Sequence, residues 1–258
     1  MSAPGWVVAK PVAHRGLHGG TAGLVENTCA AALAAIAAHC AIECDVQLSR
    51  DGEAFVFHDE RLERLTERSG LLGDLDAREV ARVQIAGSAE TIPSLQGFLA
   101  CVNGRTPLII EIKSAFDGDM RLAERTATVV AQTDGPIALK SFDPEIMAHL
   151  RTHRARLGLE RTPLGMVAEA RFDPAEWPEL DPELGRRLAQ FLHWPQTRPE
   201  FLSWCVHDLP HAVPLLLREG MGVPVMAWTV RSPPDWEIAR RWADQAVFEG
   251  EVMKSPPA

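Results

Sequence analysis

Residues 7–16 read VVAKPVAHRG, a short β-rich run that ends at His14, Arg15 and Gly16. Further along the chain, similar β-rich runs alternate with longer helical stretches, which is typical of parallel βα units. A doubly wound sheet and a closed barrel share this alternation, but a doubly wound sheet usually has a Gly-rich loop after its first strand. Neither GxGxxG nor GxxxxGKS/T follows Gly16. The stretch therefore favours an α/β fold of the TIM (β/α)8 barrel type.

The expected elements run along the whole chain, so we expect a single barrel domain over residues 1–258. Runs rich in apolar and β-branched residues predict strands at Val7–Ala13, Ala41–Leu48, Pro107–Ile112, Ile137–Phe142, Leu164–Val167, Phe201–Val206, Val223–Val230 and Ala246–Phe248. Longer amphipathic stretches predict helices at Thr28–His39, Met120–Gln132, Pro144–Arg154, His211–Glu219 and Pro234–Ala243.

The charge of the chain limits its partners. Lys and Arg total 26 against 35 Asp and Glu, which gives a formal net charge of −9. A surplus of negative charge argues against broad contact with nucleic acid or with an anionic membrane. Local basic groups can still form a small phosphate site, so a small anionic ligand remains compatible with this composition.

Cysteine usage and the N-terminus predict a cytoplasmic protein without stable membrane association. The cysteines form neither a CxxC pair nor a metal-finger spacing, and their positions are 29, 40, 44, 101 and 205. Such a dispersed, odd-numbered set fits reduced thiols. Met1–Lys10 lacks the layout of a signal peptide, and the Ala-rich run Ala30–Ala38 is too short to span a bilayer.

Two acidic residues interrupt the second predicted strand, Ala41–Leu48. Strand alternation places Glu43 and Asp45 on one face and the apolar residues between them on the other. The apolar set should face the helices, so both carboxylates should point into the barrel near its mouth. Two unpaired acids in a low-dielectric interior repel each other, and a divalent cation removes that cost. Oxygen ligands predict Mg²⁺ or Ca²⁺.

The third predicted strand repeats the pattern, with Glu111 and Lys113 on one face. Glu111 would supply a third oxygen ligand from the neighbouring strand, and Lys113 would suit a phosphate oxygen. The alternative is a buried ion-pair network of these two residues with Glu43 and Asp45. Three acids against one lysine leave surplus negative charge, which favours the metal site.

Residues 49–59, SRDGEAFVFHD, predict a small β-hairpin insertion after strand 2. An Asp-Gly pair between two β-rich runs is a strong signal for a two-residue turn. With Asp51 and Gly52 as the turn, counting back along both strands sets His58 directly opposite Asp45. Directly opposed residues share a face, so His58 should lie beside the carboxylates.

His14 is expected at the carboxyl end of the first strand, where the active site of a parallel barrel lies. A lone histidine at such a place can simply be a hydrogen-bonded structural residue. The adjacent Arg15 favours a functional role, because the pair offers a proton-transfer group beside an anion ligand.

Taken in order, these motifs resemble the glycerophosphodiester phosphodiesterase family. They are His14-Arg15-Gly16, Glu26-Asn27-Thr28, Glu43-x-Asp45, His58-Asp59 and Glu111-x-Lys113, followed by Ser141-Phe142 and Trp228-Thr229-Val230. The resemblance covers nearly the whole chain. One segment departs from the family pattern: Gln245–Glu251 stands where the family commonly has an Asp-Gly-Ile-Ile-Thr-Asp type of sequence.

The resemblance implies metal-dependent hydrolysis of glycerophosphodiesters to glycerol 3-phosphate and an alcohol. Our hypothesis for the mechanism is that this reaction passes through a cyclic phosphate. The resemblance implies His14 and His58 as the acid/base pair. The remaining implied roles are a divalent metal (Mg²⁺ or Ca²⁺) on Glu43, Asp45 and Glu111, and phosphate binding by Arg15 and Lys113. Trp228, at the mouth of a strand, would stack against substrate, with core packing as the alternative.

Two other functions remain open at this point. One is a related barrel phosphodiesterase that acts on lysophospholipids or sphingomyelin, although no obvious amphipathic membrane segment is present. The other is a non-catalytic barrel that binds ligands containing phosphate. In each case the partner is a small molecule, and the residues make no prediction of the oligomeric state.

Overall fold

A computed structural model describes residues 3–20, 23–177 and 180–250. Its strands form one sheet in the order β1-β9-β8-β7-β6-β5-β4-β2-β3, and an additional β1–β2 pairing closes it. The bounds are β1 (Val12–Ala13), β2 (Ala41–Leu48), β3 (Ala54–Val56), β4 (Leu108–Ile112), β5 (Ile137–Ser141), β6 (Leu164–Ala168), β7 (Phe201–Cys205), β8 (Val225–Val230) and β9 (Gln245–Phe248). Every pairing is parallel except β2–β3. The predicted closed parallel barrel is confirmed.

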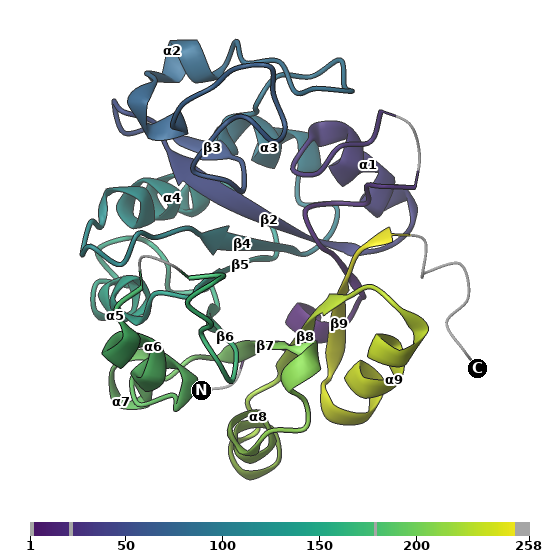
Figure 1. Ribbon diagram of the computed structural model, residues 1–258, viewed down its shortest axis with the longest axis vertical. Helices are drawn as coiled ribbons and strands as arrows, with labels where there is room; N and C mark the ends of the chain where they lie inside the picture. Colours follow the sequence, from purple (N-terminus) through teal and green to yellow (C-terminus); the bar gives the residue numbers. More distant parts are fainter. Residues whose placement is uncertain (1–2, 21–22, 178–179, 251–258) are drawn as a thin grey trace.

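Helices surround the strands (Figure 1). They are α1 (Cys29–Ala37), α3 (Leu95–Val102), α4 (Arg121–Ala131), α5 (Pro144–Thr152), α6 (Pro182–Ala189), α7 (Trp194–Thr197), α8 (Ala212–Leu215) and α9 (Pro233–Trp242), with short turns η1 (Gly5–Val8), η3 (Val206–Asp208) and η4 (Leu216–Gly220). Side-chain caps fix where several of them begin: the Thr28 hydroxyl accepts from Ala31 N, and Ser232 and Asp235 form a capping box. In the described part of the chain, no helix is both long and apolar enough to cross a membrane.

The first predicted strand, Val7–Ala13, is wrong over most of its length. Gly5–Val8 forms the 3-10 turn η1, and only Val12 and Ala13 pair with neighbouring strands. Val7 is fully buried, because it packs inside the barrel against the apolar residues at the start of the strands. The prediction failed because an apolar segment that fills the floor of the barrel has the same composition as a strand. The other predicted strands match to within two residues at each end, and helices α2, α3, α6 and α7 were not predicted.

Strand alternation divides the apolar residues into two layers. Ile42, Cys44 and Ile110 face outward and pack with helix residues in the main core. The inward-facing residues at the start of the strands, together with Val7 of η1, form the apolar barrel floor. The strand residues are Val12, Ala41, Ile109, Ala138, Phe201, Met226 and Val247. Two residues further along β2 and β4, the inward positions are Glu43 and Glu111. The barrel is therefore apolar at its floor and charged at its mouth.

Residues 49–94 form an insertion larger than the small hairpin predicted. Besides β3 it contains η2 (Leu72–Asp74) and α2 (Ala77–Val80), and it lies at the top of the view in Figure 1. It has its own buried core of Phe55, Phe57, Leu62, Leu72, Val80, Val83, Ile85 and Ile92.

The predicted register of the hairpin is wrong by one residue. Val46 pairs with Val56, and Phe57 N donates to Asp45 O at 3.0 Å, so Phe57 and not His58 stands opposite Asp45. The connection has three residues, Arg50 to Gly52, with Gly52 at a φ of +89°. A three-residue loop that ends on a glycine of positive φ replaces the two-residue Asp-Gly turn.

We expect Gly165→Ala to destabilise the barrel floor. A Cβ at Gly165 on β6 would lie 2.4 Å from Cζ of Phe201, and the close-packed floor has little room to adjust. The loss in free energy of unfolding should be about 1–3 kcal/mol, measured by urea denaturation. Gly220→Ala is the matched control, because no atom lies within 4 Å of its added Cβ. Equal unfolding midpoints for the two variants would contradict this account of the floor.

Candidate active site

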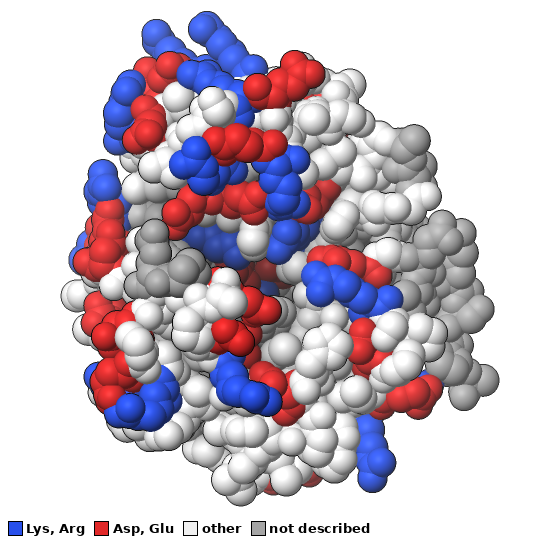
Figure 2. Space-filling model, viewed as in Figure 1, with Lys and Arg blue, Asp and Glu red and all other residues white. Residues whose placement is uncertain are grey.

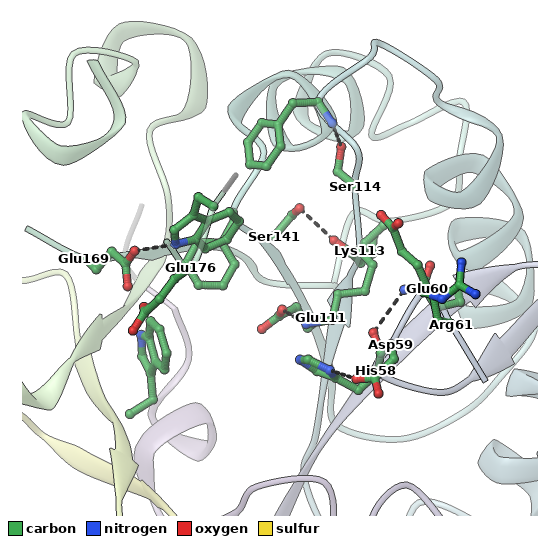
Figure 3. Close-up of a pocket in the computed structure, with 16 residues that line it drawn as sticks. His58, Asp59, Glu60, Arg61, Glu111, Lys113, Ser114, Ser141, Glu169 and Glu176 are labelled. Atoms are coloured by element: carbon green, nitrogen blue, oxygen red, sulfur yellow. Dashed lines mark hydrogen bonds and ion pairs between the residues drawn. The ribbon is translucent and has the colours of Figure 1, made fainter. Parts of the chain in front are cut away.

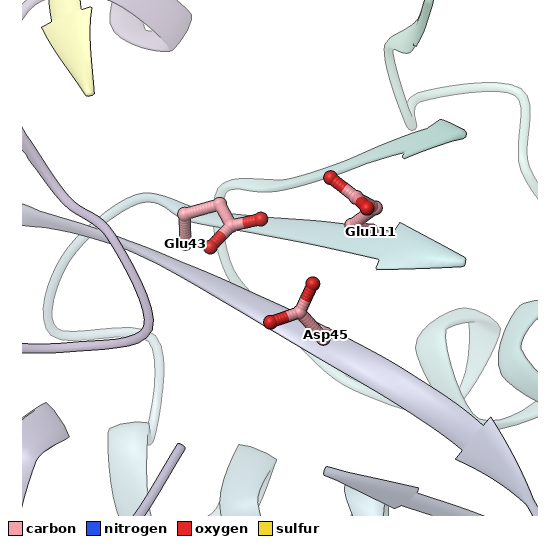
Figure 4. Close-up of side chains that lie close together, drawn as sticks. All are labelled: Glu43, Asp45 and Glu111. Carbon is pink, nitrogen blue, oxygen red and sulfur yellow. The ribbon is translucent and has the colours of Figure 1, made fainter. Parts of the chain in front are cut away.

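Three buried carboxylates lie together at the mouth of the barrel (Figure 4). Glu43 and Asp45 extend from β2 and Glu111 from β4, and one oxygen of each lies within 4.8 Å of the others. Their exposed fractions are only 0%, 1% and 4%. The parallel register sets Asp45 beside Glu111. The prediction that these side chains face the barrel interior is confirmed.

Two lysines neutralise part of this cluster. Lys113 Nζ lies 2.8 Å from Asp45 Oδ1 and 2.6 Å from Glu111 Oε1. Lys140 Nζ, on β5, lies 3.0 Å from Glu43 Oε1 and 3.1 Å from Glu111 Oε2. Burial would raise the pKa of Glu111, but the two ammonium groups lower it to about 2.

Arg15 supplies a third cation. Its Nε lies 3.2 Å from Asp45 Oδ2, and its backbone N donates to Glu43 Oε2 at 3.2 Å. Burial opposes ionisation of Asp45, but Lys113, His58 and Arg15 hold its pKa well below the ordinary value. The expectation of three acids against a single lysine is therefore wrong, because Lys140 and Arg15 also face the carboxylates.

The donor set nevertheless fits a divalent cation bound through oxygen. Among the described residues, Glu43 Oε1 and Asp45 Oδ1 are buried without a hydrogen bond of good geometry, although a lysine nitrogen lies within 3.0 Å of each. Buried carboxylate oxygens that lack directional donors are suited to coordinate a hard cation. No histidine or cysteine belongs to this group in the described part of the chain.

His14 follows β1 and is oriented by the opposite end of the chain. Its Nδ1 lies 2.5 Å from Oε1 of Glu249, which follows β9, and Arg231 Nε holds Glu249 Oε2 at 2.6 Å. Burial opposes ionisation of Glu249, but the contacts with His14 and Arg231 lower its pKa. An ionised carboxylate only accepts hydrogen bonds, so Nδ1 carries a proton and Nε2 is the ring nitrogen left to face the cluster. That Nε2 lies 3.8 Å from Glu43 Oε2.

His58, which lines the same cavity, has an equivalent arrangement. Its Nδ1 lies 2.6 Å from Asp59 Oδ1, and Arg64 Nε donates to Asp59 Oδ2 at 2.6 Å. Arg64 also binds Glu26 at 2.8 and 2.9 Å, and Glu26 in turn accepts from Arg15 at 2.8 Å. These ion pairs connect the insertion to the loop after β1.

The loop after β1 is held in place by Asn27. Its side-chain Nδ2 donates to Asp45 Oδ2 at 3.0 Å, its Oδ1 accepts from Asp45 N, and its backbone N donates to Arg15 O. Gly16, at a φ of +81°, allows close approach to α1: a Cβ there would lie 2.9 Å from Ala31. Asn27 therefore acts as a loop anchor, and Thr28 is the cap of α1.

The site opens into a cleft (Figures 2 and 3). A cavity of about 410 Å³ lies toward the insertion. Two others, of about 610 and 270 Å³, share much of their lining, and their common residues are His58, Glu111, Lys113, Phe142, Glu169, Glu176 and Trp228. His14 and Arg15 line the smaller part. In Figure 2, basic and acidic side chains gather around a hollow near the centre of this face.

Trp228 lines the cleft and is also packed. Its indole nitrogen donates to Ser203 O at 3.1 Å, and its ring meets Phe142 edge to face at 5.5 Å. Trp228 is thus packed against its neighbours and also lines the cleft, and its stacking against substrate stays a prediction.

Several residues of the cleft were missed from the sequence. Lys140 shares the inward face of its strand, so alternation could have found it. Asp59 was named only as part of the His58-Asp59 motif, and its role as the partner of His58 was not predicted. Glu249 lies in the divergent segment Gln245–Glu251, where no motif marked it; Glu251 itself lies outside the described residues. Glu169 and Glu176 follow β6, where the periodicity of the sequence is weak.

Comparison with known proteins identifies the family. A sequence profile described as the Glycerophosphoryl diester phosphodiesterase family matches residues 14–252, and the chain belongs to this family. It is 37% identical over 113 residues to the glycerophosphodiester phosphodiesterase of Bacillus altitudinis, which is 41% of this chain and 45% of that protein. The chain thus aligns with less than half the length of this protein and of the putative glycerophosphodiester phosphodiesterase of Bacillus subtilis.

Solved structures agree on the fold. A phosphodiesterase from Oleispira antarctica, in complex with its product sn-glycerol-3-phosphate, superposes with a TM-score of 0.72 at 21% identity, over 92% of this chain and 91% of that one. The glycerophosphodiester phosphodiesterase of Thermotoga maritima gives 0.68 at 22% identity, over 93% and 94%.

Proposed function

We propose that the chain hydrolyses glycerophosphodiesters to glycerol 3-phosphate and an alcohol. One observation carries this proposal: two histidines, each with Nδ1 bound to a carboxylate, line the same cavity as a cluster of carboxylates and cations at the mouth of the barrel. This arrangement offers two proton-transfer groups around an anion-binding centre. Membership of the family supports the same activity.

The cations of the cleft stabilise the negative charge of the phosphodiester and of its transition state. A phosphodiester resists attack because its anionic oxygens repel a nucleophile, and charge grows further in the transition state. Arg15 and Lys113 both line the inner cleft, where they bind the phosphoryl oxygens and offset that charge. Glu43, Asp45 and Glu111 would hold a Mg²⁺ or Ca²⁺ ion, which when bound supplies further Lewis-acid stabilisation.

Proton transfer falls to the two histidines. Nε2 of one histidine accepts the proton of the glycerol 2-hydroxyl, whose oxygen attacks phosphorus and forms a cyclic phosphate. The other histidine, protonated, donates to the oxygen of the departing alcohol. The roles reverse when water opens the ring. Glu249 and Asp59 keep each Nδ1 protonated and each ring oriented, and they stabilise the imidazolium that forms.

Both histidines should be indispensable. We expect His14→Ala and His58→Ala each to lower kcat by roughly 100-fold or more, because each removes one proton-transfer group. The assay is release of glycerol 3-phosphate from glycerophosphocholine, with circular dichroism to verify folding. His153→Ala is the matched control, since His153 ends α5 and does not line the cleft. Near-native turnover by either site variant would refute its assigned role.

Removal of divalent metal should abolish turnover reversibly. With EDTA we expect loss of glycerol 3-phosphate release, and recovery on addition of Mg²⁺ or Ca²⁺, because three buried carboxylates are available to bind the ion. Glu43→Gln should weaken metal binding measured by isothermal titration calorimetry. Full activity in EDTA would leave the carboxylates as a purely structural ion-pair network.

The cyclic step requires the 2-hydroxyl of the glycerol. A phosphocholine ester of 1,3-propanediol has the same phosphodiester but lacks this nucleophile, so we expect no detectable choline release from it. Choline release at the rate seen with glycerophosphocholine would show that water attacks phosphorus directly. Competitive inhibition by the unreactive ester serves as the control that it enters the cleft.

A further inference from the structure

The wall of the cleft that faces His58 and Lys113 is acidic and aromatic, whereas the opposite wall carries these two basic side chains. Glu169 and Glu176 lie on this wall (Figure 3). Its aromatic residues are Phe142, Trp177 and Trp228. Both carboxylates and two of the rings, Phe142 and Trp228, also line the inner part of the cleft that contains Arg15. A ligand that spans the cleft would thus meet cations at one end and aromatic and acidic groups at the other.

The aromatic rings of this wall hold one another in place. The ring centroids of Trp177 and Phe142 lie 4.9 Å apart. Those of Phe142 and Trp228 lie 5.5 Å apart, with an interplanar angle of 90°. Phe172 supports Trp177 at 5.2 Å. Rings fixed in this way present π faces and edges whose positions do not have to be ordered when a ligand binds.

Among the described residues, the carboxylates of this wall have no cationic partner. Glu169 is 6% exposed, and its Oε1 accepts from Trp177 Nε1 at 2.7 Å. Asp208, close behind, accepts from Ala170 N. No Lys, Arg or His nitrogen of residues 3–20, 23–177 and 180–250 forms a salt bridge with Glu169, Glu176 or Asp208. The three carboxylates at the barrel mouth each have such a partner, whereas the buried carboxylate of the aromatic side, Glu169, has none in the described part of the chain.

An organic cation satisfies both features of this wall. Aromatic faces attract quaternary and primary ammonium groups through the ring quadrupole, and a nearby carboxylate adds charge attraction. A neutral alcohol would leave the buried carboxylate unpaired, and an anionic one would be repelled. We propose that Glu169, Glu176, Phe142 and Trp177 bind the ammonium group of the leaving alcohol, so that cationic amino-alcohol esters are the preferred substrates. This inference rests on the proposed function.

Substrate preference tests the inference directly. We compare kcat/KM for glycerophosphocholine and glycerophosphoglycerol by release of glycerol 3-phosphate. The unmodified protein should prefer the choline ester by about tenfold, and Glu169→Gln should remove most of that preference. Glu60→Gln is the matched control, because Glu60 is an exposed glutamate that lines the same cleft beside Arg61; its preference should stay unchanged.

Three results with the unmodified protein and Glu169→Gln would overturn the inference. These are equal kcat/KM values for the two esters, an unchanged ratio in Glu169→Gln, and an equal loss with both esters, which would place Glu169 at the glycerol half. If Glu60→Gln also lost the preference for the choline ester, the preference would reflect the total negative charge of the cleft rather than the aromatic wall. This result would also overturn the inference.

Direct binding separates this inference from the proposed function. If neither ester is hydrolysed, the proposed function fails, and calorimetric titration with tetramethylammonium then tests the wall alone. Saturable binding to the unmodified protein and to Glu60→Gln, lost in Glu169→Gln and Trp177→Ala, supports the cation site. Absence of binding to the unmodified protein overturns it.

Discussion

The ion pairs at the mouth of the barrel are the constraint on which the site depends. Buried charges are costly to desolvate, and removal of one partner leaves an uncompensated charge that costs about 3–5 kcal/mol. Glu43 and Glu111 share Lys140, and Asp45 is shared by Lys113 and Arg15. Each cation thus joins elements that are far apart in sequence. The loop after β1, β2, β4 and β5 can lie together at the mouth only in an arrangement that satisfies every pair.

Further ion pairs position both histidines beside this cluster. Arg15 binds Glu26, and Glu26 also binds Arg64. Arg64 in turn binds Asp59, which orients the ring of His58. His14 is set from the other end of the chain by Glu249. The insertion of residues 49–94 therefore does more than cover one side of the barrel. Its separate core gives Asp59 and Arg64 a rigid base, and a site built on packed elements holds its geometry better than one on free loops.

How much of this could be predicted depends on the range of the interactions. Alternation along β2 and β4 is local, so the inward direction of Glu43, Asp45 and Glu111 could be predicted. The strand predicted at Val7–Ala13 failed because burial in the barrel floor, a tertiary effect, selects the same apolar residues as a strand. The hairpin register failed because one extra loop residue shifts the pairing. His58 nevertheless lies at the site, through Asp59 and Arg64, and such long-range ion pairs have no signature in residue spacing.

Glu169 of the aromatic wall lowers the stability of the folded state, and a residue that does so can indicate function. Burial, together with Glu176 and Asp208, raises the pKa of Glu169 from its ordinary 4.5 to about 7, although the bond from Trp177 opposes the shift. Below pH 4.5 the carboxyl is protonated in both the folded and the unfolded chain. As the pH rises to 7 the unfolded chain releases this proton first, so the folded state loses stability. A glutamine of the same size would avoid that loss. A cation bound beside Glu169 would favour the ionised form, lower this pKa again and restore the stability.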